Sequence, residues 1–128
     1  MEYQGSERRR YKRMMKCNFT IRFRICCKDS DFIEPEWNIV IMKNLSACGI
    51  CFHYTKRIEL GTVVEFIIEL PKVEHSIHCL GEVCRVDELT CRVSPPGQTH
   101  LYGIAVRLTE IETDKQEAIN KFVEDSYF

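Results

Sequence analysis

The sequence predicts a mainly β fold, a six-stranded antiparallel β-barrel with one C-terminal α-helix. Six segments show the alternation or the β-branched composition that is typical of strands. Hairpin-length connections join them, and no helical segment separates successive strands, as a parallel sheet would require. Helical periodicity occurs only near the end of the chain, at Thr113–Asp125. These observations favour an antiparallel barrel over a doubly wound sheet.

The first three predicted strands surround one turn. Apolar and polar residues alternate across Cys17–Ile25, which is typical of a strand with one buried face. Trp37–Lys43 is rich in β-branched residues and forms the second strand. The polar and glycine positions of Asn44–Gly49 predict a turn after it. The third strand is Ile50–Tyr54, in which apolar side chains again recur at every second position.

The next three strands are separated by clear breaks. The fourth follows a turn at Gly61 and is ended by Pro71, since proline cannot donate to a ladder. The fifth spans roughly Ser76–Val86, and its alternation shifts near Gly81. This shift predicts a β-bulge, although an error in the assumed register would give the same pattern. The sixth strand covers Leu101–Leu108, with apolar side chains on one face.

A loop and a helix complete the chain. Thr90–Thr99 contains two prolines followed by a glycine, so we expect an exposed loop. Thr113 and Gln116 have the spacing of a capping box and predict the start of a helix. An apolar stripe on this helix would pack either on the barrel or against another subunit, so a homo-oligomer stays open. The stripe consists of Ala118, Ile119, Phe122 and Val123.

The composition is that of a single globular domain. Of 128 residues, 45% are hydrophobic and 29% are charged, which argues against disorder. No apolar run approaches the roughly 20 residues of a membrane span, and the N-terminus lacks the apolar core of a secretory signal. We therefore expect a cytoplasmic protein with no membrane association. Its eight cysteines are then interpreted as reduced and mostly buried thiols.

Positive charge is concentrated near the N-terminus. Six of the ten residues Glu7–Lys16 are basic, although the formal net charge of the chain is −1. These side chains repel one another, and no apolar anchor precedes Cys17. We therefore expect residues 1–16 to form a flexible basic segment. Residues 17–128 would form the barrel, with its helix at about 113–126.

The first of two functional motifs lies in this basic segment. It consists of Arg9-x-x-x-Arg13, directly preceded by Arg8. Arginine side chains bind phosphates, and they also present paired hydrogen-bond donors that fit O6 and N7 of guanine. A basic run alone is more often a solvated tail or an unspecific polyanion patch, so this motif needs a second feature beside it.

The second motif, Asn44-x-Ser46-x-x-Gly49, supplies that feature at the turn between the second and third strands. The Asn44 amide can address a base edge that both donates and accepts hydrogen bonds. Ser46 adds a small hydroxyl group. Gly49 permits either close backbone approach or a positive φ angle. The two motifs together provide complementary halves of a guanine-nucleotide site.

In this order the motifs resemble those of the PilZ domain family, which are cytosolic bacterial receptors for cyclic di-GMP. Glu7–Arg13 is similar to the family's R-x-x-x-R segment, and Asn44–Gly49 matches its D/N-x-S-x-x-G turn in full. Gly81–Val83 and Tyr102–Val106 resemble its later strand signatures, so the resemblance covers nearly the whole chain. The less typical stretch Cys26–Asp31 removes no ligand contact. The family fold is a six-stranded antiparallel split barrel.

The resemblance implies a role for each motif residue. Arg9 and Arg13 would embrace the guanines and phosphates of cyclic di-GMP. Asn44 and Ser46 would contact a guanine from the barrel surface, and Gly49 would shape the turn beneath it. No cofactor is implied besides this ligand.

Ligand stoichiometry and signalling are also implied by the resemblance. An arginine at the position of Arg8 is associated in the family with a stacked, intercalated ligand dimer. A dianionic ligand that bridges both motifs would wrap the basic segment onto the barrel and change the surface offered to a protein partner. Family analogy places this unidentified partner in motility, exopolysaccharide, adhesion or transcription machinery.

Catalysis and metal binding are disfavoured by the sequence. It contains no G-x-S-x-G elbow, P-loop or H-E-x-x-H pattern, so we predict that the protein is not an enzyme. Cys48-x-x-Cys51 lacks the second closely spaced pair of a zinc site. Cys51 begins a strand, whereas a thioredoxin-like motif needs a helix N-terminus. We therefore predict neither a metal site nor a redox site.

Two alternative binding functions stay open. Tyr11 and Trp37 could stack on the bases of a single-stranded nucleic acid. This function ranks lower because basic charge is confined to one segment and acidic residues mark other strands. A PilZ-like fold could instead serve as a protein-interaction module without the nucleotide. Such degenerate members typically lack the arginines or the turn residues, and this sequence retains both.

Overall fold

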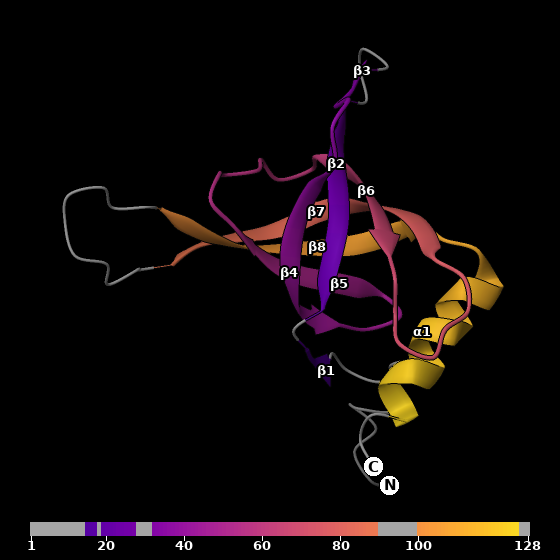
Figure 1. The fold of residues 1–128 in the computed structure, drawn as a ribbon. Coiled ribbons are helices and arrows are strands. Elements are labelled where there is room, and N and C mark those ends of the chain that lie inside the picture. The colour runs from indigo at the N-terminus through magenta and orange to yellow at the C-terminus, as the bar shows by residue number, and fades with distance from the viewer. Residues whose placement is uncertain (1–14, 18, 28–31, 90–99, 126–128) are drawn as a thin grey trace, which may run out of the picture.

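The computed structural model describes residues 15–17, 19–27, 32–89 and 100–125. These residues contain six longer strands and one helix, α1 (Thr113–Asp125) (Figure 1). The longer strands are β2 (Thr20–Cys27), β4 (Asn38–Leu45), β5 (Gly49–Tyr54), β6 (Val63–Ile68), β7 (Ile77–Leu89) and β8 (Leu101–Glu110). They pair antiparallel in the order β4-β5-β8-β7-β6-β2, and β2 also pairs with β4, which closes the ring. The predicted β-barrel with a C-terminal helix is therefore confirmed.

Two short strands extend the barrel and were not predicted. β1 (Met15–Lys16) pairs with the end of β4, and β3 (Phe32–Ile33) pairs with the end of β2. A strand of two residues has too little alternation to be detected in a sequence. Residues 1–14, which make up most of the basic segment, and the predicted loop Thr90–Thr99 lie outside the described residues.

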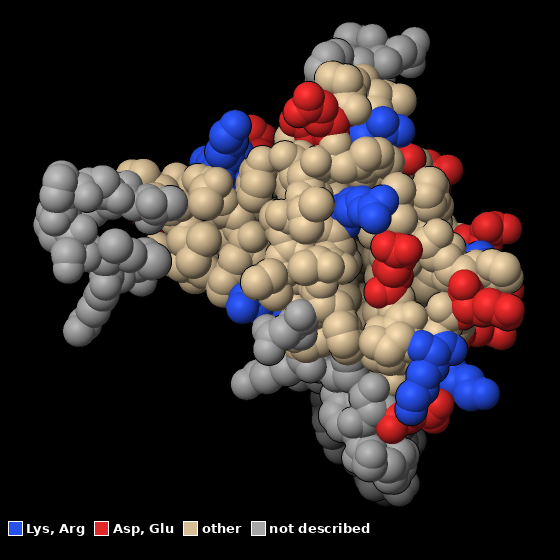
Figure 2. Space-filling view, in the orientation of Figure 1, with Lys and Arg blue, Asp and Glu red and all other residues tan. Residues whose placement is uncertain are grey.

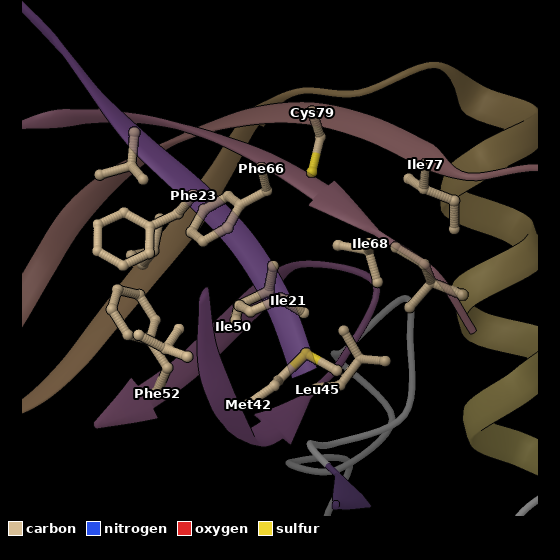
Figure 3. Packing of buried hydrophobic residues seen from close by; sticks show 14 of the residues in the cluster. Ile21, Phe23, Met42, Leu45, Ile50, Phe52, Phe66, Ile68, Ile77 and Cys79 are labelled. Carbon is tan, nitrogen blue, oxygen red and sulfur yellow. The ribbon is translucent and has the colours of Figure 1, made fainter. Parts of the chain in front are cut away.

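The barrel interior is filled by the apolar faces of its strands (Figure 3). Phe23 of β2, Phe52 of β5 and Phe66 of β6 are fully buried. The ring centroids of Phe23 and Phe52 are 4.9 Å apart, and those of Phe52 and Phe66 are 6.1 Å apart. Because β5 pairs with neither β2 nor β6, these contacts cross the interior of the barrel. The alternation that predicted the strands is thus the pattern that fills the core.

The bulge predicted near Gly81 is confirmed. Pairing between β7 and β8 changes register between Leu80 and Gly81, and again between Val83 and Arg85. At Gly81 an added Cβ would lie only 2.9 Å from the carbonyl oxygen of Arg107. Glycine is therefore required at this position because the neighbouring strand comes too close for a side chain.

The helix packs on the barrel. Ile119 and Val123 are fully buried in the main hydrophobic cluster, which decides between the two sequence-based alternatives for the apolar stripe. The predicted capping box is wrong. The amide of Gln116 donates to the carbonyl oxygen of Glu112 at 2.9 Å, so Glu112, not Thr113, occupies the N-cap position. The Gln116 side chain has a different partner, which is described below.

The described cysteines are more exposed than predicted. The six whose side chains are described are free thiols, and only Cys79 among them is buried. Cys48 and Cys84 are exposed, and the other three are half-buried: Cys17, Cys26 and Cys51. The expectation of mostly buried thiols is therefore wrong, because several of these residues lie on the outward faces of strands or in a turn. Burial raises the pKa of the Cys79 thiol to about 12.

Among the described residues, α1 is neither long enough nor apolar enough to span a membrane. In the same residues, no three side chains of histidine, cysteine, aspartate or glutamate are grouped so that they could hold a metal ion.

Candidate functional site

The turn between β4 and β5 is closed by one side chain. The hydroxyl oxygen of Ser46 accepts hydrogen bonds from the amides of Cys48 and Gly49, both at 3.1 Å. The amide of Ser46 donates to the carbonyl oxygen of Gly49 at 3.0 Å. Ser46 is only 7% exposed and Gly49 is buried, so the bonds between these two residues satisfy groups that have little access to water. Ser46 thus has a structural role in the turn besides the ligand contact predicted for it.

Asn44 lies where β4 enters this turn. It is half-buried, and it stands opposite Lys16 of β1 on one side and Cys51 of β5 on the other. A β-bulge between Met42 and Asn44 shifts the register of β4 against β5 just before the turn. Among the described residues, no group forms a hydrogen bond with the Asn44 side chain. Its amide can therefore donate to and accept from an incoming molecule without losing an internal bond.

Gly49 is the first residue of β5. It is buried and stands opposite Arg107 of β8. Among the described glycines, only Gly61 has a positive φ, at 85°, in agreement with the turn predicted there. Of the two possibilities predicted for Gly49, a positive φ is therefore wrong, and a close approach of the backbone stays a prediction.

The back of the turn is held by two other elements. The amide of Leu108 in β8 donates to the carbonyl oxygen of Cys48 at 2.9 Å. The side-chain amide of Gln116 in α1 donates to the carbonyl oxygen of Ala47 at 3.0 Å. The sequence analysis missed this role of Gln116. A signal was present, since Gln116 lies three residues before buried Ile119 and so occupies the inward face of the helix.

The N-terminal side of the site is positioned by β1. Met15 pairs with Leu45, and Lys16 pairs with Asn44, so the chain enters the barrel directly beside the turn. Arg13 precedes Met15 by two residues, which limits the distance between their Cα atoms to about 7 Å. The same bound for Arg9 is about 20 Å. The structure therefore brings the end of the basic segment to the turn.

The three predicted arginines themselves lie outside the described residues: Arg8, Arg9 and Arg13. Their contacts with a ligand stay predictions, as do those of the turn residues.

The surroundings of the turn include a positive charge on β4. Burial lowers the pKa of His53, and the ammonium group of Lys43 lowers it further. Burial raises the pKa of the half-buried Cys17 thiol, against smaller lowering effects of a backbone hydrogen bond from Phe19 and of Lys43. Lys43 of β4 thus lies near Cys17, which directly follows β1, and near His53 of β5.

Two hollows of the described surface lie away from the turn. One, of about 610 Å³, is lined by Glu65, Glu110 and Glu112 among others. Its carboxylates would repel a dianionic ligand. The other, of about 540 Å³, lies between α1 and the segment Pro71–Val73. Neither includes Asn44, Ser46 or Gly49.

Comparison with known families identifies the fold. A family model of the PilZ domain matches residues 7–125, which include both motifs and the helix. The chain belongs to the PilZ domain family. The match begins before the basic motif and ends at the last residue of α1, so it covers the candidate site of this PilZ domain in full. No curated protein matches the chain.

Solved structures agree with this assignment. The inhibitor of motility of Bacillus subtilis, MotI/DgrA, has 19% sequence identity and a TM-score of 0.63 over 93% of this chain and 51% of its own. MrkH of K. pneumonia has 16% identity and a TM-score of 0.65 over 91% of this chain and 48% of its own.

A second MrkH structure, described as a c-di-GMP-dependent transcription regulatory factor, has 16% identity and a TM-score of 0.65. That match covers 93% of this chain and 51% of MrkH. The PilZ domain described here thus spans about half the length of these proteins. At such identities the likeness shows the fold.

Proposed function

We propose that this PilZ domain is a receptor for cyclic di-GMP, which it binds between its basic N-terminal segment and the Asn44–Gly49 turn. The observation that carries the proposal is the pairing of Lys16 with Asn44, because it tethers the arginine motif to the turn. The family assignment supports the ligand class. So does the description of MrkH as a c-di-GMP-dependent factor.

The chemistry of the two halves is complementary. Arg9 and Arg13 supply positive charge and forked donors for the phosphates and for O6 and N7 of guanine. Asn44 offers an amide that no described residue engages. The Ser46 oxygen already accepts two backbone amides, so its hydroxyl proton is left to be donated to a ligand acceptor.

Ligand binding would act through the basic segment. Its arginines repel one another in the empty protein, and a bridging dianion would neutralise them and fix the segment against the turn. A protein partner in the cytoplasm would then recognise the changed surface. In this proposal the protein is a receptor module without catalytic activity of its own. Arg8 would contact a second, stacked ligand molecule.

A specific observation favours one second candidate, a protein-interaction module that does not bind the nucleotide. Two isoleucines on the outer face of β4 are exposed, Ile39 by 69% and Ile41 by 47%. Exposed apolar side chains on a strand are typical of protein-binding surfaces. Binding of nucleic acid has less support, because basic and acidic side chains are interspersed on the face shown in Figure 2. Arg24 and Glu65, for example, form an ion pair at 2.7 Å.

Isothermal titration calorimetry with cyclic di-GMP tests the receptor function. We expect an affinity of about 1 μM or tighter. Binding should be abolished in the double variant Arg9→Ala, Arg13→Ala. The control is Lys56→Ala, Arg57→Ala, which removes the same charge from exposed positions beyond the opposite end of β5. A stoichiometry of two nucleotides per chain would support the role of Arg8, and linear GMP should not bind.

If the folded protein does not bind cyclic di-GMP in the titration, the receptor function is overturned and the interaction module is favoured. An equal loss of affinity for cyclic di-GMP in both double variants would show unspecific attraction of an anion, since the two pairs of residues carry the same charge. Both outcomes contradict a site built from the motifs.

A further inference from the structure

Gln116 joins two segments that are 69 residues apart in the sequence. Its side-chain nitrogen donates to the carbonyl oxygen of Ala47 at 3.0 Å. Ala47 is 1% exposed and lies in the middle of the Asn44–Gly49 turn. A buried carbonyl that loses such a donor is costly, so the bond fixes the position of the turn relative to the first part of α1.

A second contact joins α1 to the chain that follows β1. The rings of Phe122 and Phe19 meet edge to face with centroids 5.7 Å apart. The carbonyl oxygen of Phe19 accepts the amide of Met42 in β4 at 2.7 Å. Just before it, the amide of Cys17 donates to the carbonyl oxygen of Lys43 at 3.0 Å. Phe122 therefore packs on the segment that connects the basic N-terminus to the barrel.

The helix thus contacts the turn and the chain that leads from the basic segment into the barrel. Gln116 holds the turn, and Phe122 packs on the chain that carries the arginine motif. Between them, fully buried Ile119 anchors the helix in the hydrophobic cluster. A small shift of either part would be expected to move α1 as well, since the contacts join closely packed elements.

We propose that α1 is coupled to the nucleotide site through Gln116, which acts as a positioning residue for the turn. The inference rests on the proposed function, and it adds the element that responds to the ligand. When cyclic di-GMP bridges the turn and the basic segment, the contacts of α1 with the turn and with Phe19 are restrained together. The helix then unfolds locally less often. By reciprocity, loosening the Gln116 attachment weakens ligand binding.

Amide hydrogen exchange measured with and without saturating cyclic di-GMP tests the coupling. In the wild-type protein, ligand should slow the exchange of amides in Gln116–Asn120 by roughly threefold or more. In Gln116→Glu, which has the same shape but cannot donate to Ala47, this slowing should be lost. The affinity measured by calorimetry should fall roughly three- to tenfold. Gln116→Met also lacks the donor and should show the same loss of slowing and of affinity. This second variant keeps the test valid if Gln116→Glu does not fold.

The matched control is Glu117→Ala, an exposed position on the same helix. It should retain both the affinity and the slowing. A purely structural role of Gln116 would change exchange equally with and without ligand, so the ligand-dependent difference separates the two roles.

The outcomes distinguish this inference from the function on which it rests. No binding to the wild-type protein would overturn the receptor function and, with it, the coupling. Wild-type binding with unchanged exchange in α1 would overturn the coupling alone. Wild-type affinity and wild-type slowing in either Gln116 variant would do the same.

Discussion

Two hydrogen bonds join Ser46 to Gly49 across the turn, one donated by each residue. The Ser46 hydroxyl oxygen accepts the amide of Gly49 at 3.1 Å, and the Ser46 amide donates to the carbonyl oxygen of Gly49 at 3.0 Å. The motif serine therefore shapes the surface on which the nucleotide would lie, and the geometry of the site depends on the stability of the turn.

We predict that Ser46→Ala lowers the free energy of unfolding by about 1–3 kcal/mol, because the amides of Cys48 and Gly49 lose their acceptor. Urea unfolding followed by circular dichroism measures the loss. Ser76→Ala removes a hydroxyl from an exposed position and serves as the control. A loss no larger than that of the control would contradict the structural role of Ser46.

The bulge in β7 makes a second prediction, for Gly81. A methyl group there would press on Val106 and on the carbonyl oxygen of Arg107, so Gly81→Ala should cost about 1–3 kcal/mol of unfolding free energy. The control is Gly103→Ala in β8, where the nearest atom to an added Cβ is 3.7 Å away, and where we expect a change within about 0.5 kcal/mol. Similar losses at both glycines would count against the close approach at Gly81.

Gly81 also shows which features can be predicted from a sequence. The bulge combines a glycine with a break in alternation, and both are local signals, so it was predicted correctly. The six barrel strands were found for the same reason. β1 and β3 were missed because two residues carry no periodicity. The bond between Gln116 and Ala47 joins residues that only the folded chain brings together, and local spacing led instead to an incorrect capping box.

The candidate site was predictable only in part. The motif spacing located Asn44 and Gly49 at the turn, but the hydrogen bonds of Ser46 depend on how that turn closes. The burial of cysteines was misjudged, because composition does not reveal which face of a strand a thiol occupies.

Thiol reactivity makes a third prediction. At pH 8 the Cys79 thiol stays protonated, because its pKa of about 12 lies well above that pH, and it is also buried. Iodoacetamide should therefore modify Cys48 and Cys84, which are exposed, and spare Cys79 until the protein is denatured. Peptide mass spectrometry gives the extent at each site. Modification of Cys79 in the folded protein as fast as that of Cys48 would contradict its burial.

The same pKa gives a dependence of stability on pH. The folded-state pKa of Cys79 lies above the ordinary value of 9.0, so the folded protein binds this proton more tightly than the unfolded chain. Its contribution to stability is complete below pH 9 and is lost as the pH rises from 9 to about 12. Cys79→Ala should therefore show a shallower loss of unfolding free energy over that range than the wild-type protein, in matched urea titrations. Identical slopes would contradict the raised pKa.

Asn44 makes a prediction that contrasts with Ser46. No described residue bonds to the Asn44 side chain, so Asn44→Ala should change the free energy of unfolding by no more than about 0.5 kcal/mol. If the amide contacts a guanine, the same substitution should weaken cyclic di-GMP binding roughly tenfold, because two hydrogen bonds to the base edge are lost. Calorimetry and urea unfolding on the same preparation separate the two effects. A strong loss of stability would show that Asn44 supports the fold, and unchanged affinity would remove it from the ligand site.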